Sequence, residues 1–327
     1  MTPKDLMKIV RFYGRFTPSY TKIGYFGRGL FLKRYRTDFS GQRWLVTGAS
    51  GGIGKAIAQA AAKYGAEVVV VGRSEEKLKQ VIAELPSAIA SRVSYEVTDM
   101  SLQKDTEDLV DRIAAAGNKF DALINNVGVL FNTVTLTSEG REATFATNLL
   151  SHYVLTEGLI NRGLFNDKGV VVNMTSGGMY NAPVGTANLN ITDPEKFNGK
   201  IAYGAHKRGQ AVLTGYWNKV YGSRGLSFYL THPGWAKTMG VKSALPVFWK
   251  IQYLLLRTPY QGGETAIWLA ATRPPTSEDH DAGVWFDHKI HPAHMFATTT
   301  PQCTVEEFVA YMDAEVAKGQ AGENVAA

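Results

Sequence analysis

The segment Tyr203-Gly-Ala-His-Lys207 places a phenol and an ammonium four residues apart within a pattern that predicts a helix. Residues i and i+4 lie on one helix face, so the Lys207 ammonium can sit beside the Tyr203 hydroxyl. An unperturbed tyrosine has a pKa of about 10. A neighbouring cation lowers that pKa toward neutral pH, where the phenol can exchange protons. A Tyr-x-x-x-Lys pair alone is a frequent surface feature, so its meaning depends on the rest of the chain.

The glycine-rich run TGASGGIG at 47–54 supplies the context for that pair. An apolar strand pattern at 43–47 leads into it, a helical pattern at 53–64 leads out, and a second strand pattern ends in Gly72-Arg73. Such a βαβ unit binds dinucleotides, because glycines let the backbone approach a pyrophosphate and the helix N-terminus presents free N–H groups. The spacing fits both TGxxxGxG and TGxxGxxG, so it does not separate short dehydrogenases from epimerase-like proteins.

Three further polar positions are candidates for the same site. Ser176 ends the fifth strand pattern, and Asn125-Asn126-Val127-Gly128 ends the fourth. Ligands of open α/β sheets bind at the carboxyl ends of strands. Asn148 falls inside a long apolar helical pattern at 137–162, where an asparagine is costly to bury unless it is hydrogen-bonded. Asn148 is therefore either a site residue or a satisfied amide of the core.

The elements that must position these residues alternate along the chain. Strands that are apolar nearly throughout, such as Val68–Val71, indicate a parallel sheet covered on both faces. Strict alternation predicts an α/β fold, a single doubly wound Rossmann-type domain with a seven-stranded parallel sheet. We expect strands at 43–47, 67–71, 92–97, 120–125, 169–174, 226–231 and 283–287, and helices at 53–64, 75–85, 102–116, 137–162, 200–222 and 260–272. A last helix is predicted at 304–318, where Thr304 and Glu307 can form a capping box.

Composition limits the class of protein. The 327 residues are 45% hydrophobic and 20% charged, which is ordinary for a globular chain. The single cysteine, Cys303, excludes an internal disulfide and a multi-thiolate metal site, and no metal is expected. No apolar stretch approaches the roughly 20 residues that span a bilayer, and we identify no secretory signal. A soluble, cytoplasmic protein is therefore expected.

The first 40 residues form a basic, aromatic arm ahead of the domain at 41–327. They hold nine Lys or Arg against Asp5 and Asp38, a net charge of +7 in a chain whose total is +6, together with nine aromatic residues. Basic residues interleaved with aromatics suit an anionic membrane surface. The alternative is an arm packed on the domain with its charges in water. We do not expect nucleic acid as a partner.

These motifs, in this order and at these spacings, resemble the short-chain dehydrogenase/reductase superfamily from about residue 41 to 290. The matching elements are TGASGGIG (47–54), Asp99, NNVG (125–128), Asn148, Ser176, YGAHK (203–207) and HPGWAKT (232–238). The resemblance decides the glycine spacing in favour of the short-chain class. It implies that Ser176 orients a substrate oxygen and that Tyr203 exchanges the proton. It also implies that Lys207 lowers the tyrosine pKa and holds the nicotinamide ribose, while Asn148 supports a water relay behind Lys207.

Two departures from the common pattern are visible. Val127 stands where the family often has alanine, and the separation of Ser176 from Tyr203 leaves an extra loop at 177–202. That longer loop is typical of the retinol-dehydrogenase-like branch. The cofactor contacts that the resemblance implies are Thr47, Gly48, Ser50, Gly51, Gly52, Ile53, Gly54, Arg73, Asp99, Met100, Asn126, Val127, Gly128, Tyr203, Lys207, Pro233, Gly234, Trp235 and Thr238.

The end of the second strand distinguishes the two nicotinamide cofactors. NAD-specific members usually carry Asp or Glu there, to accept a hydrogen bond from the ribose 2′-hydroxyl. This chain has Gly72-Arg73-Ser74, and a guanidinium suits a 2′-phosphate, so NADP is the expected cofactor.

The predicted activity combines these features. By resemblance, segment 238–258 is the substrate lid, and its apolar composition suggests a hydrophobic ketone or aldehyde that is interconverted with its alcohol. The same segment could instead pack on the domain or on a second subunit of a homodimer. The alternative to an NADP(H)-dependent oxidoreductase is a catalytically silent nucleotide-binding scaffold protein.

Overall fold

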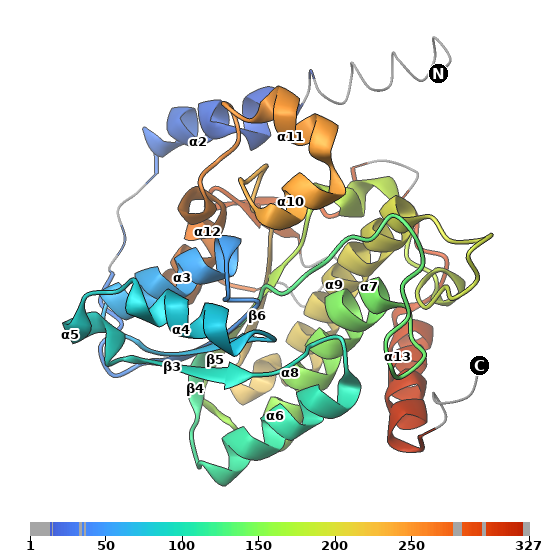
Figure 1. The fold of residues 1–327 in the computed structure, drawn as a ribbon, viewed down its shortest axis with the longest axis horizontal. Helices are drawn as coiled ribbons and strands as arrows, with labels where there is room; N and C mark the ends of the chain where they lie inside the picture. Colours follow the sequence, from blue (N-terminus) through green and yellow to red (C-terminus); the bar gives the residue numbers. More distant parts are fainter. Residues whose placement is uncertain are drawn as a thin grey trace.

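A computed structural model describes residues 14, 16–32, 35, 37–276, 283–295 and 299–322 of the chain. Its centre is an eight-stranded sheet in the order β3-β2-β1-β4-β5-β6-β7-β8, with helices on both faces (Figure 1). The strands are β1 Arg43–Thr47, β2 Glu67–Gly72, β3 Val93–Val97, β4 Phe120–Asn125, β5 Phe165–Met174, β6 Ser227–Thr231, β7 Val284–Phe286 and β8 Lys289–His291. The order reverses between β1 and β4, and in such sheets ligands bind at this point.

The predicted doubly wound domain is confirmed, and strands β1 to β7 are parallel as expected. The eighth strand was not predicted. It pairs antiparallel with β7 through a tight turn in which Asp287 and His288 both have positive φ angles, of 47° and 61°. A two-residue hairpin of this kind usually contains Asn-Gly or Asp-Gly, so Asp-His gave no turn signal.

Two hydrophobic cores lie on opposite faces of the sheet. Helices α3 (Gly52–Lys63), α4 (Glu75–Ala83) and α12 (Pro259–Thr272) enclose one, which includes Ile57 and Ile267. The other, which includes Leu155 and Trp217, lies under α6 (Gln103–Ala115), α8 (Ser151–Asn161), α9 (Gly199–Tyr221) and α13 (Val305–Gln320). The short helices α5 (Ser87–Ala90) and η4 (Gly222–Arg224) end the connections to β3 and β6.

The helix predicted at 137–162 begins later than expected and is not regular. Helix α7 (Ala143–Phe145) passes into a π-helical turn, η1 (Ala146–Leu150), before α8 begins. The Glu142 carboxylate accepts hydrogen bonds from the N–H groups of Thr144 and Phe145, at 2.9 and 2.8 Å, and so fixes the helix start. Single π-helical turns are frequent at functional sites, and this one contains Asn148.

The extra loop at 177–202 is packed on α9. It contains the two 3-10 helices η2 (Gly177–Asn181) and η3 (Thr186–Asn188). His206 of α9 bonds to the Leu189 carbonyl at 2.8 Å, and Arg208 donates to the Met179 carbonyl at 2.9 Å. Buried polar side chains of one helix therefore fix the course of the loop.

The arm and the lid lie together beyond the carboxyl ends of the strands. Helix α2 (Lys22–Gly29) of the arm lies beside α11 (Pro246–Gln252) of the lid, which follows α10 (Met239–Ala244) (Figure 1). Phe16 and Tyr20 are buried, so this part of the arm packs on the domain. Packing on the domain was one of the two alternatives stated for the arm. Most of the arm's basic residues lie outside the described residues, namely Lys4, Lys8, Arg11, Arg15, Lys33, Arg34 and Arg36. No helix in the described part of the chain is long and apolar enough to cross a membrane.

Candidate active site

The glycine loop packs against the segment that follows β4. At Gly54 a Cβ atom would lie 2.4 Å from Nδ2 of Asn126 and 2.5 Å from the Gly48 carbonyl oxygen. At Gly48, where φ is +63°, a Cβ atom would lie 2.8 Å from the Val127 Cα atom. Any side chain at these two positions would force the two segments apart.

Polar contacts fix the same two segments. The Thr47 hydroxyl oxygen accepts hydrogen bonds from the N–H groups of Asn126 and Val127, at 3.0 and 3.1 Å. The Asn126 amide donates to the Thr47 carbonyl at 2.9 Å. Helix α3 begins at Gly52, and a Cβ atom at Gly51 would meet nothing within 4 Å. The N–H groups of the first turn lack intrahelical partners, and the open space beside Gly51 leaves room for the pyrophosphate of a dinucleotide.

The expected adenosine end of the site has an exposed cation. Arg73 follows β2, is exposed, and makes no ion pair with any residue that the structure describes. The Ser50 hydroxyl lies 3.5 Å from where a Cβ atom at Gly72 would stand, so the loop reaches this strand end. Asp99 accepts hydrogen bonds from the Ser101 N–H and hydroxyl groups, at 2.9 and 2.7 Å.

Two predicted cofactor residues use their side chains elsewhere. Met100 is buried in the core under α6, and Ile53 packs against α12 at Gly262 and Gly263. Only the backbone groups of Met100 and Ile53 remain for a cofactor.

The segment after β6 joins the cofactor side to the lid. Thr238 caps α10 by accepting a hydrogen bond from the Val241 N–H group at 3.2 Å. The Cγ2 atom of Thr238 lies 3.3 Å from where a Cβ atom at Gly52 would stand. The Trp235 ring contacts the Phe248 ring of α11 edge-on, with centroids 5.0 Å apart. Pro233, Gly234, Trp235 and Thr238 therefore lie where the lid meets the glycine loop.

Ser176 and Tyr203 come together although they are far apart in the sequence. Ser176 follows β5, Tyr203 lies near the start of α9, and the Ser176 side chain is close enough to the phenol to affect its pKa. Gly178 lies against the Tyr203 ring, where a Cβ atom would be 3.1 Å from two ring carbons. Burial raises the pKa of Tyr203, and the Ser176 side chain only partly opposes this. The lowering of that pKa by Lys207, expected from the sequence, stays a prediction.

The Lys207 ammonium is buried beneath the tyrosine. It donates to the Met174 carbonyl at 2.9 Å and lies 5.9 Å from the centroid of the Tyr203 ring. Burial lowers the pKa of Lys207 to about 7. A Cβ atom at Gly128 would lie 3.4 Å from this ammonium and 3.3 Å from the Asn148 side-chain oxygen, so glycine keeps both groups accessible from the loop after β4.

Asn148 has the satisfied amide that one of the two alternatives required, and its role in a water relay stays a prediction. Its amide accepts from the Val129 N–H group and donates to the Val129 carbonyl, each at 2.8 Å, and is thus satisfied within the core. Its backbone carbonyl accepts a hydrogen bond from Nε2 of Gln210 at 2.9 Å, and Oε1 of Gln210 lies 3.4 Å from the Lys207 ammonium. A glutamine side chain therefore connects Lys207 with Asn148.

Sequence reasoning missed this glutamine and the histidine behind it. Nε2 of Gln210 lies 2.8 Å from Nδ1 of His152, and Nε2 of His152 lies 3.0 Å from the Val127 carbonyl. Burial lowers the pKa of His152 to about 3, so the ring is neutral and can accept at Nδ1 while it donates at Nε2. Gln210 follows Lys207 by one helical turn, which is the only signal that could have identified it.

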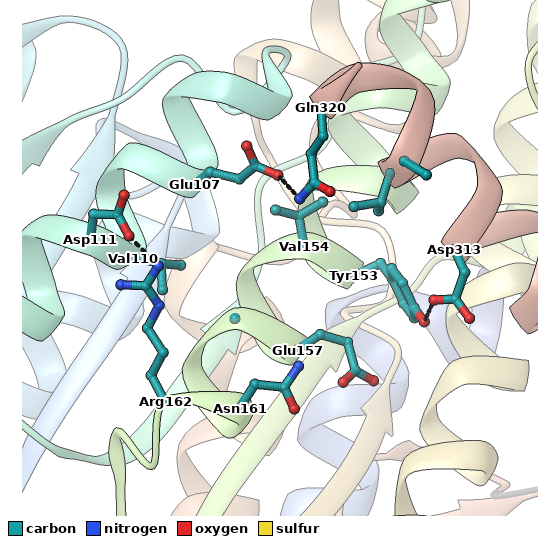
Figure 2. Close-up of a pocket in the computed structure, with 13 residues that line it drawn as sticks. Glu107, Val110, Asp111, Tyr153, Val154, Glu157, Asn161, Arg162, Asp313 and Gln320 are labelled. Carbon is teal, nitrogen blue, oxygen red and sulfur yellow. Dashed lines mark hydrogen bonds and ion pairs between the residues drawn. The ribbon is translucent and has the colours of Figure 1, made fainter. Parts of the chain in front are cut away.

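The structure also has a cavity away from the predicted site residues. A cavity of about 510 Å³ lies between α6, α8 and α13, and Figure 2 shows its polar lining. Tyr153 donates to Asp313 at 2.6 Å and Gln320 donates to Glu107 at 2.9 Å across it. None of the predicted site residues lines it. Among the described residues, no group of three His, Cys, Asp or Glu side chains could hold a metal ion.

Comparisons with known proteins agree with this geometry. The family model for short chain dehydrogenases matches residues 42–189. Dehydrogenase/reductase SDR family member 12 of Bos taurus is 32% identical over 296 residues, which cover 88% of this chain and 90% of that protein. Retinol dehydrogenase 11 of Mus musculus is 27% identical and covers 70% of this chain and 72% of its own length.

A solved structure extends the likeness to three dimensions. An Escherichia coli protein (strain CFT073) of this type, complexed with NADPH, superposes with a TM-score of 0.58 at 26% identity. The match covers 72% of this chain and 94% of the other. The chain therefore belongs to the short-chain dehydrogenase/reductase family, in its retinol-dehydrogenase-like branch, close to family member 12.

Proposed function

We propose that this protein is an NADP(H)-dependent oxidoreductase that reduces a hydrophobic ketone or aldehyde to its alcohol. The observation that carries the proposal is the approach of the Ser176 hydroxyl to the Tyr203 phenol, above the buried Lys207 and beside the glycine loop. A scaffold protein would have no need of a hydroxyl pair at this strand end.

The reaction follows from the protonation states of these groups. The hydroxyls of Ser176 and Tyr203 bind and orient the carbonyl oxygen of the substrate. A nicotinamide bound beside them would supply a hydride to the carbonyl carbon. As the oxygen gains negative charge, Tyr203, whose phenol is protonated at neutral pH, transfers its proton to it. Lys207 holds the nicotinamide ribose and, while protonated, stabilises the phenolate that remains.

Two features support NADP(H) as the cofactor. Arg73 is exposed at the end of β2, where an acidic residue would bind the ribose of NAD, and a guanidinium can bind a 2′-phosphate through two parallel hydrogen bonds. The Escherichia coli protein of the same fold was solved with NADPH. Thr47 and Asn126 would fix the shape of the loop, and the first-turn N–H groups of α3 would hold the rest of the dinucleotide.

A hydrophobic substrate is supported by the wall of the site. The edge-on pair of Trp235 and Phe248 borders the cofactor side of the lid. One relative is a retinol dehydrogenase, an enzyme named for an apolar isoprenoid alcohol. We expect aromatic, steroid-like or isoprenoid carbonyl compounds to be reduced in preference to sugars.

The test measures NADPH consumption with a panel of hydrophobic and polar carbonyl compounds, using the wild type and Tyr203→Phe. Because general acid catalysis contributes about 10²- to 10⁴-fold, the variant should lose at least about 10² in turnover. Its NADPH affinity should stay within a few fold, since the ring still packs. A variant that keeps more than about a tenth of the activity would contradict the assignment of Tyr203 as the acid. A wild-type protein that binds NADPH and reduces no carbonyl would favour the scaffold alternative.

A further inference from the structure

Helix α11 of the lid turns its apolar stripe to solvent. Val247 and Ile251 lie on one face of the helix, and Leu254 continues that face after its end. These three residues and Met239 of α10 are 69% to 78% exposed. A surface helix of a globular domain normally buries this stripe and exposes its polar one. The inward side of α11 carries the half-buried Phe248 and Trp249, so the helix is apolar on both sides, and the domain's own packing does not account for the outer stripe.

Helix α2 of the arm also exposes an apolar stripe to solvent. Ile23, Phe26 and Leu30 recur at helical spacing, and together with Phe31 they are 58% to 83% exposed. The arm's buried aromatics, Phe16 and Tyr20, precede the helix. The residues that anchor the arm are therefore different from those that α2 presents to solvent.

The two stripes are held side by side by backbone and ionic contacts. The Lys22 N–H group donates to the Leu255 carbonyl at 2.9 Å, directly after α11. The Arg257 guanidinium donates to the Tyr20 carbonyl at 3.0 Å and is paired with the buried carboxylate of Asp287. Figure 1 shows α2 and α11 together at the outer end of the molecule. We call their shared surface the lid–arm face, made of Ile23, Phe26, Leu30, Phe31, Met239, Val247, Ile251 and Leu254.

The charged residues in the segments that form the lid–arm face are all basic. Neither 14–32 nor 233–263 contains an Asp or Glu residue, whereas Lys242 and Lys250 belong to the two lid helices. A contiguous apolar patch with a basic border fits the surface of an anionic bilayer, into which such helices insert their apolar side in the interface plane. A symmetric pair of copies would bring lysines against lysines, which opposes a dimer through this face.

We propose that the lid–arm face docks the protein on an anionic lipid bilayer, with α2 and α11 lying in the interface. If the proposed function holds, the lid over the substrate site then faces the bilayer, from which a hydrophobic substrate enters. The docking goes beyond the proposed reaction and does not depend on it. Its readout is vesicle binding, which requires no turnover.

The experiment uses the full chain and phosphatidylcholine vesicles with or without phosphatidylserine. The double variant Ile251→Asp/Leu254→Asp should lose at least about tenfold in vesicle affinity, because two buried apolar contacts are removed. Phe26→Asp should show a similar loss through α2. The control is Val220→Asp, an exposed valine in the last turn of α9, about 25 Å along that helix from Tyr203. It should bind vesicles like the wild type.

A charge variant tests the choice of lipid. Each lysine near an anionic surface contributes about fivefold in affinity, so Lys242→Glu/Lys250→Glu should weaken binding to phosphatidylserine vesicles by at least about 25-fold. Thermal unfolding and NADPH binding establish that each variant is folded. Folded apolar variants that bind vesicles as tightly as Val220→Asp would overturn the proposal. Variants that change only the sedimentation of the free protein would assign the face to a second copy of the chain and also overturn it.

Discussion

The glycine loop at 47–54 meets the lid at 238–258 at Thr238, yet the two are held by different kinds of contact. The loop packs through backbone atoms and leaves no room for a Cβ atom at Gly48 or Gly54. The lid and arm are joined to the domain by backbone hydrogen bonds and by the ion cluster of Arg257, Asp287 and Arg28. The close packing fixes the shape of the glycine loop. The attachment of the lid and arm leaves their outer surface free to be altered without disturbing the core.

The ion cluster is the more costly of the two to break. Arg257 and Asp287 are both buried, and their two hydrogen bonds measure 2.7 and 2.8 Å. Burial alone would raise the pKa of Asp287, but hydrogen bonds from Arg257 keep that pKa below its ordinary value. Removing one partner of such a pair leaves a buried charge without compensation.

Asp287→Ala should therefore have the largest effect on stability, a loss of about 3–5 kcal/mol in the free energy of unfolding. Denaturant unfolding followed by tryptophan fluorescence measures it. Asp167→Ala, at an exposed position of β5, is the matched control and should change stability little. Equal stabilities of the two variants would show that the arm and lid do not depend on this cluster.

Gly54→Ala tests the backbone packing of the loop. The new Cβ atom would overlap the Gly48 carbonyl and the Asn126 amide, and overpacking of this kind costs about 1–3 kcal/mol. Gly51→Ala is the control, because a Cβ atom there meets nothing within 4 Å and the φ angle of −179° is ordinary extended backbone. In the absence of cofactor, thermal unfolding should separate the two variants. If Gly51→Ala is as unstable as Gly54→Ala, the close approach to Asn126 is not what limits the loop.

Arg73→Ala tests the exposed end of the proposed cofactor site. Hydrogen bonds to charged groups contribute about 1.5–3 kcal/mol, which corresponds to about 10- to 150-fold in affinity. The variant should bind NADPH more weakly by that factor and NADH almost unchanged, as measured by titration calorimetry. A parallel loss of both affinities would mean that Arg73 supports the loop rather than the 2′-phosphate.

Substitutions of Gln210 should have the smallest effect, which is a shift in the pH profile of kcat/KM. Since burial lowers the pKa of Lys207 to about 7, the ammonium is lost as pH rises through that value, and kcat/KM should fall over the same range. Gln210→Leu removes a hydrogen-bond acceptor, lowers the pKa of Lys207 further, and should move this falling limb to lower pH by up to about 1 unit. Gln210→Glu places a negative charge beside the ammonium and should move the limb to higher pH. A uniform loss of activity without either shift would assign Gln210 a structural role alone.

Much of the fold was predictable because its signals are local. Apolar runs such as 68–71 and 170–172 indicate parallel strands by their own composition, and Thr304 with Glu307 forms the expected capping box of α13. The strand β8 and the π-helical turn at Asn148 were not predictable. A three-residue strand has no period of its own, and the widened turn depends on what packs around it.

The sequence by itself determined the order of the βα units, the glycine loop and the spacing of Tyr203 and Lys207, because these depend on neighbours within a few residues. Only the tertiary structure decided that Ser176 reaches Tyr203 and that Gln210 links Lys207 to Asn148. It also decided that burial raises the pKa of Tyr203 and lowers the pKa of Lys207. It also decided that the arm packs against the lid while both turn apolar side chains outward. The desolvation of a charge and the exposure of a helix face depend on segments remote in sequence, so no local pattern contains them.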